Sequence, residues 1–440
     1  MGGDNHVRHL RGLINRLSLA VDPYCGIIQA VTPMALNPEV TGLLHGSAAL
    51  LGRPAALRPK EIALMDDSPV TGYGTAITPE LAEVRAICEA LERYCSLMPP
   101  PAKARLRATA RELGNNALDI STLPHCSKAE RAAAPKEFRL VLPTPERAIE
   151  WVPGMSLTRN RDIWVPLTCV YLGLPLPLND HLSFPISTGF AAGDDYDQAI
   201  RAGLLEVVER DSLAIWWLAQ SPFPRLSAPF TDHHTIAQLL PALAGRGLET
   251  HLFDLTTDVG LPVIGLVQLS VQTFPHAVTM AACRPSAQDA ALRVIEEAAS
   301  LRTALAASRY VADDFSDLLS GVPVAAERFG LYHAGPNGVA RFRRLIARAP
   351  EFGTASANMA SDGFIASVVA RLDAMGHEVV VVDVTVPEVR DLGLVVVRVL
   401  VPGLMPLTFS HAIRFLVHPR LQAATERFGT TVCNEPIPYA

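Results

Sequence analysis

Residues 183–217, SFPISTGFAAGDDYDQAIRAGLLEVVERDSLAIWW, decide how the rest of the chain is interpreted. A turn rich in serine and glycine at residues 187–189 leads into a long helical pattern. On that helix Glu206 and Glu209 are three residues apart, so both carboxylates project from one face. Buried carboxylates need a neutralising partner such as a divalent cation, and free N–H groups at a helix start suit an anion. The stretch therefore predicts a site for a metal and an anion, a combination that indicates a nucleotide.

The acidic pattern ExxER of residues 206–210 occurs a second time at residues 89–93. The second copy lies on a helix that we expect to begin at the cap Thr78 and at Pro79, and to end before the prolines at 99–101. A glycine-rich turn, GYGT, precedes this helix as well. Charged helix faces are common and usually only solvated, but two copies after similar turns favour one shared site.

The composition is typical of a soluble globular protein. Of the 440 residues 49% are hydrophobic and 19% are charged, and the net charge of −6 indicates no basic face for nucleic acid. No apolar run is long enough for a membrane span, and arginines interrupt the N-terminal apolar runs, unlike those of a signal peptide. The seven cysteines form no CxxC pair, which argues against structural zinc and fits reduced thiols. We therefore predict a cytoplasmic protein that binds neither nucleic acid nor membranes.

Alternating helical patterns and β-branched runs indicate an α/β fold. Strand patterns at residues 151–157 and 162–172 flank a turn at 160–162, which predicts a hairpin. Residues 98–150 are expected to form a helical and loop excursion, and residues 311–356 to be less regular. The other expected helices are 7–20, 79–97, 233–244, 287–308 and 358–375, and the other expected strands are 26–31, 250–256, 262–271, 276–284, 377–385 and 392–403.

Five sequence blocks, taken in order, resemble the YcaO superfamily, whose members use ATP to phosphorylate a peptide backbone amide. They are GYGTAITPELAEVRAICEALERYC, STGFAAG with LLEVVERD, AALRVIEEAASLR, DVTVPEV and LGLVVVRVLVPGL. The resemblance begins near residue 68 and implies a YcaO-type α/β fold, with mixed β-sheets and helices around a site for ATP and Mg²⁺. Residues 68–440 would be the ATP-binding catalytic domain, and residues 1–67 an N-terminal helix and strand segment.

The resemblance also implies roles for acidic and basic residues. In this family paired glutamates hold Mg²⁺ ions that bridge the nucleotide phosphates, and arginines neutralise phosphate oxygens. These residue types suit the task, because Mg²⁺ prefers oxygen ligands and a guanidinium group binds phosphate through two donors. The implied metal ligands are Glu89, Glu92, Glu206, Glu209 and Glu297. The implied nucleotide contacts are Ser187, Thr188, Gly189, Tyr73, Arg85, Arg93, Arg210 and Arg302, and Glu206, Glu209 and Arg210 are also expected to be catalytic.

Four positions depart from the family pattern. Arg85 replaces the serine of SxxxExxER, and Ser300 replaces a glutamine of the third block. Tyr73 replaces a frequent lysine, and Thr188 a frequent asparagine. Arg85 could supply the charge of the absent lysine, and Tyr73 could stack on the ligand or pack beside it. Because the glutamates are intact, we expect an active enzyme.

Three features of the ExxER helices allow more than one interpretation. Arg93 and Arg210 could bind phosphate, or could only pair with glutamates and fix the helix geometry. Asp211 could contact the ligand or brace its helix. Trp216 and Trp217 could be core residues or a platform for the substrate.

The C-terminal tail, residues 434–440, ends in PIPYA. Azoline-forming members of the family resemble one another in a proline-rich PxPxP tail that helps to build the active site, and this chain matches two of the three prolines. A functional tail and a disordered terminus both remain open. The carboxylate of Ala440 and the imidazole of His181 are candidates for the catalytic base.

The resemblance favours an ATP-dependent cyclodehydratase that makes thiazoline or oxazoline from Cys, Ser or Thr in a ribosomal precursor peptide, as in antibiotic biosynthesis. The expected partners are a separate leader-binding protein similar to ubiquitin-activating enzymes and a flavin dehydrogenase that makes azoles. The chain could also form a homodimer. Two alternatives remain: another amide activation that forms a thioamide or macroamidine, and a non-catalytic nucleotide-binding adaptor.

Overall fold

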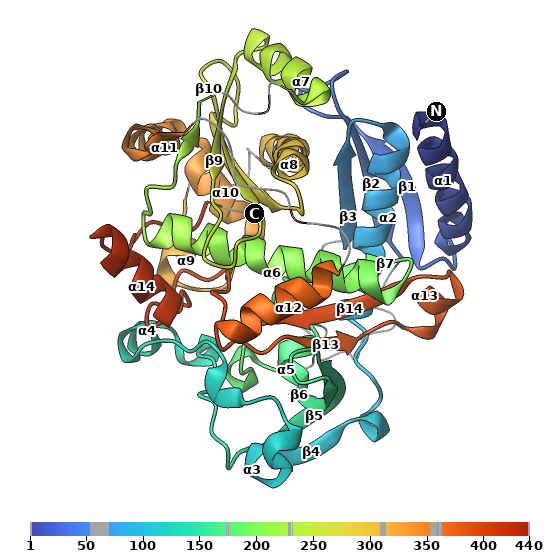
Figure 1. Cartoon of the computed structure of the whole chain (residues 1–440), viewed down its shortest axis with the longest axis vertical. Coiled ribbons are helices and arrows are strands. Elements are labelled where there is room, and N and C mark those ends of the chain that lie inside the picture. The colour runs from blue at the N-terminus through green and yellow to red at the C-terminus, as the bar shows by residue number, and fades with distance from the viewer. Residues whose placement is uncertain are drawn as a thin grey trace.

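The structure is a computed structural model in which helices pack against and between three β-sheets (Figure 1). It describes residues 2–52, 70–172, 174, 176–227, 230, 232–308, 314–352, 359 and 363–438. The predicted α/β fold with mixed sheets is confirmed. Ala440 lies outside the described residues, so the role expected for its carboxylate stays a prediction. Within the described part of the chain, no helix is both long and apolar enough to cross a lipid bilayer.

The first sheet is antiparallel and lies near the N-terminus. Its strands follow the order β1 (Ile28–Met34), β2 (His45–Leu51) and β3 (Thr71–Ala76). Helix α2 (Pro79–Ser96) packs on β2 and β3, and α1 (Gly2–Leu17) packs on α2 (Figure 1). The hydroxyl of the cap residue before α2 accepts from a backbone N–H of the first turn, as its sequence predicts.

The glycine-rich segment before α2 is a strand and not the predicted turn. In β3, a Cβ atom on Gly74 would lie 2.0 Å from the carbonyl oxygen of Ala82, and one on Gly72 would lie 2.2 Å from that of Ala86. The two glycines therefore allow the strand backbone to touch the helix backbone. This close contact brings the backbone of Tyr73 within hydrogen-bonding distance of the α2 carboxylates.

The second sheet is formed by strands that are distant in the sequence. Its order is β4 (Leu106–Thr109), β5 (Ala148–Ser156), β13 (Val380–Asp383), β14 (Val395–Leu400) and β7 (Phe190–Gly193), with β6 (Arg161–Pro166) also paired to β5. The predicted β5–β6 hairpin is confirmed. However, β6 is shorter than expected, because residues 167–170 form a helical turn, α5 (Leu167–Val170).

Strand β7 separates the serine and glycine turn from the helix that it was predicted to start. Helix α6 (Tyr196–Leu218) begins only after Asp195, whose side chain caps it. Gly189 in the turn has φ +86°, a conformation that glycine adopts readily. The N–H groups of the turn therefore do not belong to a helix N-terminus, so the expected start of α6 is wrong, and the contacts expected of the turn stay predictions.

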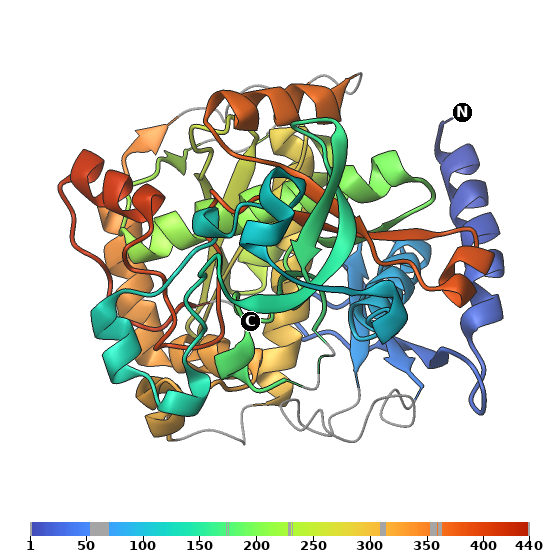
Figure 2. The same cartoon turned by 90° about the horizontal axis from the view of Figure 1, so that it is seen from below.

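The third sheet lies on the opposite side of α6. Its order is β11 (Ala277–Cys283), β10 (Val263–Ser270), β9 (Leu248–Asp254), β8 (Arg225–Leu226) and β12 (Glu351–Phe352), and α7 (His234–Gly245) packs on β9. Helix α8 (Ala287–Ala307) packs on β10 and β11, and α6 contacts the same two strands. Because α6 also packs on β7 and β14, it is enclosed between two sheets, as Figures 1 and 2 show. That position explains why most of its residues are apolar and buried.

The C-terminal third contains more helix than we expected. Residues 311–356, predicted to be less regular, include α9 (Ser316–Ser320), α10 (Ala326–Ala334) and α11 (Pro336–Arg348). The start of α10 has no side-chain cap, so it lacks the local signal that marks the better predicted helices. The predicted helix at 358–375 is α12 (Phe364–Ala374), and α13 (Pro387–Asp391) and α14 (Pro419–Phe428) follow it.

The described part of the C-terminal tail is packed against the protein. Trp217 donates its indole N–H to the carbonyl of Glu435, and the imidazole Nε2 of His333 lies 2.8 Å from the carbonyl oxygen of Pro436. Ile437 is 5% exposed. Of the two interpretations of the tail, a disordered terminus does not describe the residues up to 438.

Candidate functional site

The predicted metal ligands come from three helices, α2, α6 and α8, and form a row. The charges of Glu89 and of Glu206 on α6 both raise the pKa of Glu92 on α2, so the carboxylates of the two helices interact electrostatically. Glu209 is in turn influenced by Glu297 of α8 and by Glu206. The structure therefore brings together five glutamates that are widely separated in the sequence.

The two glutamates of α2 are each held by a strand backbone. Glu89 accepts a 2.7 Å hydrogen bond from the N–H of Tyr73, and its second oxygen lies 2.6 Å from Arg93. Glu92 accepts a 2.8 Å hydrogen bond from the N–H of Ala192 in β7, and the described residues give its second oxygen no hydrogen bond. Glu89 is thus held through both oxygens and Glu92 through one, which leaves Glu92 with an oxygen that can bind another ligand.

The two glutamates of α6 are held in the same way. Glu206 accepts from the N–H of Gly189 and Glu209 from the N–H of Cys283, both at 2.9 Å. The guanidinium of Arg210 lies 3.4 Å from Glu206 and 3.6 Å from Glu209. Arg210 is therefore ion-paired with the carboxylates, and the same guanidinium could also face a phosphate.

Helix α8 carries the predicted ligand Glu297 and a second glutamate, Glu296, for which the sequence motifs predicted no role. Glu297 forms a 2.6 Å ion pair with Arg293. Its neighbour Glu296 is buried and binds Arg85 at 2.5 Å, and it also accepts from the N–H of Ile77. Arg85 therefore stands where the family has serine because Glu296 neutralises it, and burial lowers its pKa to about 10.

The remaining predicted contacts divide into two groups. Thr188 and Gly189 lie beside Glu206, and Tyr73 is 43% exposed next to Glu89. Ser187 accepts a backbone hydrogen bond from Phe190 within the same turn. Arg302, in contrast, is not brought to the carboxylates.

Arg302 is a structural residue in this fold. Its guanidinium is fully buried and donates to Gln268 on β10 of the third sheet and to the carbonyl of Pro275 in the connection before β11. These bonds favour a structural role for Arg302, and its contact with the nucleotide stays a prediction. His181 is also buried, and no hydrogen bond or ion pair within the described residues connects it to the glutamates.

The structure resolves the alternatives for the end of the second ExxER motif. Asp211 is fully buried and accepts two 2.7 Å hydrogen bonds from Arg420 of α14, so it braces the helix. Trp216 and Trp217 are 1% and 3% exposed and belong to the main hydrophobic core. None of the three is a platform for a ligand.

The glutamate row fits a magnesium–nucleotide complex. No group of three or more His, Cys, Asp or Glu side chains converges on one point within the described ranges. Mg²⁺ bound with a nucleotide commonly uses only one or two carboxylates, and water and phosphate oxygens complete its shell. Facing pairs of glutamates with an arginine beside each pair match that requirement.

The charges of the row are incompletely neutralised. Burial, together with the charges of Glu89 and Glu206, raises the pKa of Glu92 to about 8, although a hydrogen bond from Ala192 opposes the shift. Burial likewise raises the pKa of Glu209 to about 7, although Arg210 opposes the shift. A bound cation would relieve both effects, which is what a metal site requires.

The ligand-free protein should lose stability as the pH rises from about 4.5 to about 8. The folded pKa of Glu92 is about 8 and its ordinary value is 4.5, so the folded state holds a proton that the unfolded state releases over this range. The contribution is fully present below pH 4.5 and is lost through pH 8. Urea denaturation at a series of pH values measures it. Glu92→Gln should flatten the dependence, and an unchanged slope would contradict the assignment.

Comparison with known proteins identifies the family. A family model described as YcaO cyclodehydratase, binding ATP and Mg²⁺, matches residues 73–405. The chain belongs to the YcaO family. The resemblance of the sequence motifs is thereby confirmed.

Two curated YcaO relatives are similar over most of the chain. An uncharacterized protein of Methanothermobacter thermautotrophicus is 28% identical over 80% of this chain and 85% of its own. A protein of Rhizobium leguminosarum bv. trifolii, described as an uncharacterized protein in the tfuA 3′ region, is 28% identical over 70% of this chain and 73% of its own.

Solved YcaO structures show the same fold. A heterocyclase in complex with substrate and cofactor has a TM-score of 0.75 at 21% identity; the alignment covers 98% of this chain, which spans only 57% of that one. YcaO from Methanopyrus kandleri, bound with AMPPCP and Mg²⁺, has a TM-score of 0.58 at 21% identity and 90% coverage of both chains. The E. coli microcin synthetase McbBCD complex with pro-MccB17 bound has a TM-score of 0.61 at 14% identity, covering 93% of this chain and 96% of that chain.

Two arginines near the YcaO glutamates were missed by the motif analysis. Arg284 follows β11, and its charge lowers the pKa of Glu209. Arg398 lies on β14 close enough to Glu206 for the carboxylate to act on its pKa. Both are single arginines in apolar strand patterns, and a basic residue inside a buried strand is the signal that could have found Arg398.

Proposed function

We propose that this protein is an ATP-dependent cyclodehydratase that acts in the cytoplasm on a backbone amide of a ribosomally made precursor peptide. The observation that carries the proposal is the glutamate row: the ExxE pairs on α2 and α6 influence each other's charge and that of Glu297, and each pair is held in place by the protein. The YcaO relative bound with AMPPCP and Mg²⁺ supports ATP and Mg²⁺ as the ligands of this row.

The residues of this chain would do three things in the reaction. The free carboxylate oxygens would hold Mg²⁺, and Arg93, Arg210 and Arg284 would face the phosphates. Because the strands fix the carboxylates before any ligand binds, little reorganisation is needed, and such preorganised charge is the main source of electrostatic catalysis. ATP with Mg²⁺, when bound, supplies the phosphoryl group that activates the amide oxygen. The peptide loses one water in total, which ATP takes up as it becomes ADP and phosphate.

We also propose that the substrate is a peptide and that the protein works together with partner proteins. The McbBCD structure is a complex with pro-MccB17 bound, which supports a peptide substrate and assembly with other proteins. We expect a separate leader-binding protein and, for azole products in antibiotic biosynthesis, a flavin dehydrogenase.

Mass spectrometry of a candidate precursor peptide incubated with the protein, ATP and Mg²⁺ tests the proposal. The expected result is loss of one water at a Cys, Ser or Thr, together with release of one phosphate per ring. Alkylation of the product then distinguishes a cyclised cysteine, which no longer reacts, from a free one. Exchange of oxygen for sulfur would overturn the cyclodehydratase assignment in favour of thioamide formation. Product without phosphate release would overturn the role of ATP.

A further inference from the structure

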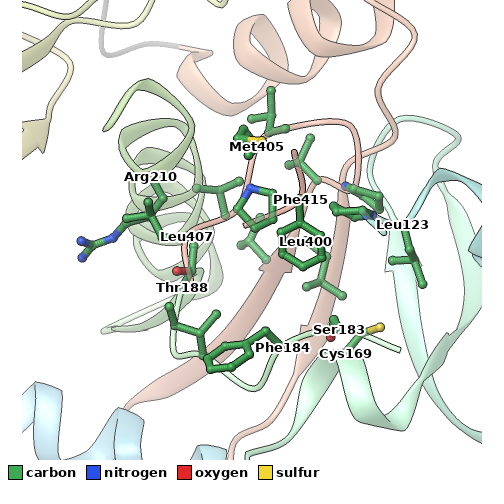
Figure 3. Close-up of a pocket in the computed structure, with 18 of the residues that line it drawn as sticks. Leu123, Cys169, Ser183, Phe184, Thr188, Arg210, Leu400, Met405, Leu407 and Phe415 are labelled. Atoms are coloured by element: carbon green, nitrogen blue, oxygen red, sulfur yellow. The ribbon is translucent and has the colours of Figure 1, made fainter. Parts of the chain in front are cut away.

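An apolar pocket is lined by Val207 and Arg210 of α6, the helix that carries Glu206 and Glu209. Its empty volume is ≈ 710 Å³. Its apolar walls include Phe184, Val207, Leu400, Met405, Leu407 and Phe415. They come from the segment before β7, from α6, and from β14 with the loops that follow it. Figure 3 shows these side chains gathered around the pocket.

The pocket and the row share α6 and the turn before β7. Arg210 and Thr188 line the pocket, and Figure 3 shows the Arg210 guanidinium pointing away from the apolar side chains. That guanidinium pairs with Glu206 and Glu209, so its stem faces the pocket and its charge faces the row. A molecule in the pocket would therefore reach the glutamates past Thr188.

Arg398 is the buried charge of this pocket. It lines the pocket and is only 6% exposed. Its Nε and Nη1 atoms have no hydrogen-bond partner among the described residues, and its guanidinium lies 4.5 Å from the centre of the Phe190 ring. Buried donors without acceptors are costly, so they indicate a missing oxygen ligand.

The residues that line the pocket indicate what kind of molecule it binds. An apolar cavity with one buried guanidinium suits a molecule with an apolar group next to an oxygen acceptor. In a peptide, the side chain and the carbonyl of one residue have this arrangement. The nearby glutamates place the site for phosphoryl transfer next to that carbonyl.

We propose that the pocket binds an apolar side chain of the residue directly before the modified Cys, Ser or Thr, and that Arg398 donates to the carbonyl oxygen of that residue. This inference rests on the proposed function, because that carbonyl oxygen is the one that ATP would activate. The pocket then determines which peptide positions are modified. Arg398 stabilises the negative charge that develops on the oxygen as the side chain of the next residue adds to its carbon.

Two short acetylated peptides that differ only in Leu-Cys versus Gly-Cys test the pocket. Fluorescence anisotropy with labelled peptides measures binding without turnover. The Leu-Cys peptide should bind about tenfold or more tightly than the Gly-Cys peptide, the scale of discrimination by an apolar pocket. Leu407→Phe, which fills the pocket, should remove the preference and leave Gly-Cys binding unchanged. Equal binding of both peptides to the unmodified protein would overturn the proposal.

Arg398→Gln tests the oxygen contact. It should lower kcat for cyclisation about a hundredfold with either peptide, because one oxyanion donor is lost. The affinity for AMPPCP with Mg²⁺ should change less than about twofold, since Arg398 faces the peptide oxygen. Arg343→Gln is the control, because Arg343 pairs with Glu249 outside the site. An equal loss of AMPPCP affinity would overturn the proposal by placing Arg398 on the nucleotide.

The failures of the two proposals can be separated. If neither peptide loses water but Leu-Cys still binds more tightly, the cyclodehydratase assignment fails and the pocket assignment stands. If octanoate binds in an Arg398-dependent manner and neither peptide competes with it, the pocket takes apolar carboxylates and our inference is wrong.

Discussion

Glu206→Gln should reduce ATP consumption at least about hundredfold, because the substitution removes a carboxylate that would hold Mg²⁺ in phosphoryl transfer. The side-chain amide keeps the shape of Glu206 and can still accept the hydrogen bond from the N–H of Gly189. The strand and helix should therefore stay in place while the charge is lost. Release of phosphate in the presence of peptide and Mg²⁺ measures the effect.

The control for this variant lies on the same helix. Asp197 is exposed in the first turn of α6, and Asp197→Asn also removes one negative charge. Its phosphate release should stay within about twofold of the unmodified protein, because exposed charges at this distance are screened. Full activity of Glu206→Gln would show that the carboxylate is not a metal ligand. Equal losses in both variants would indicate a general effect of charge.

Arg420→Ala should lower the free energy of unfolding by about 3–5 kcal/mol, the usual cost of breaking a buried ion pair on one side. Arg420 of α14 binds both carboxylate oxygens of Asp211 at 2.7 Å, and Asp211 is fully buried. The N–H of Met405 donates to the same carboxylate, so the pair also holds one wall of the pocket. Without the guanidinium, an unpaired charge remains in the core.

Chemical denaturation followed by circular dichroism measures this loss. Arg427→Ala is the matched variant, because Arg427 lies on the same helix but is exposed, with its guanidinium over the ring of Phe428. Its cost should stay below about 1 kcal/mol. If Arg420→Ala costs no more than this control, the ion pair does not stabilise the fold.

The helices that carry the glutamates could be predicted from the sequence. Thr78 and Ser286 cap α2 and α8, so these two starts combine a local hydrogen bond with helical periodicity. Helix α6 was predicted as a helix, but it begins later than expected, after its cap Asp195. The repeated ExxER pattern gave the two pairs of carboxylates. These signals lie within a few residues of one another and do not depend on the rest of the fold.

The features that the sequence did not predict depend on contacts between residues that are distant in the sequence. Whether GYGT is a turn or a strand is decided by the packing of α2 on Gly72 and Gly74. The burial of Arg302 depends on the position of Gln268 in β10. The pocket is closed by Phe184 and Phe415, and nothing in the local sequence of either residue indicates the other.

The anchoring of the glutamates has a consequence for synthesis on the ribosome. Glu92 and Glu206 are held by β7 and the turn before it, and β7 pairs with β14, which lies 202 residues further along the chain when counted from Gly193 to Val395. Glu209 gains its backbone hydrogen-bond donor only after Cys283, at the end of β11, has been synthesised. A partly synthesised chain therefore holds its glutamates without the strands that aim them. We therefore expect that a nascent chain cannot convert ATP to ADP and phosphate until its synthesis is nearly complete.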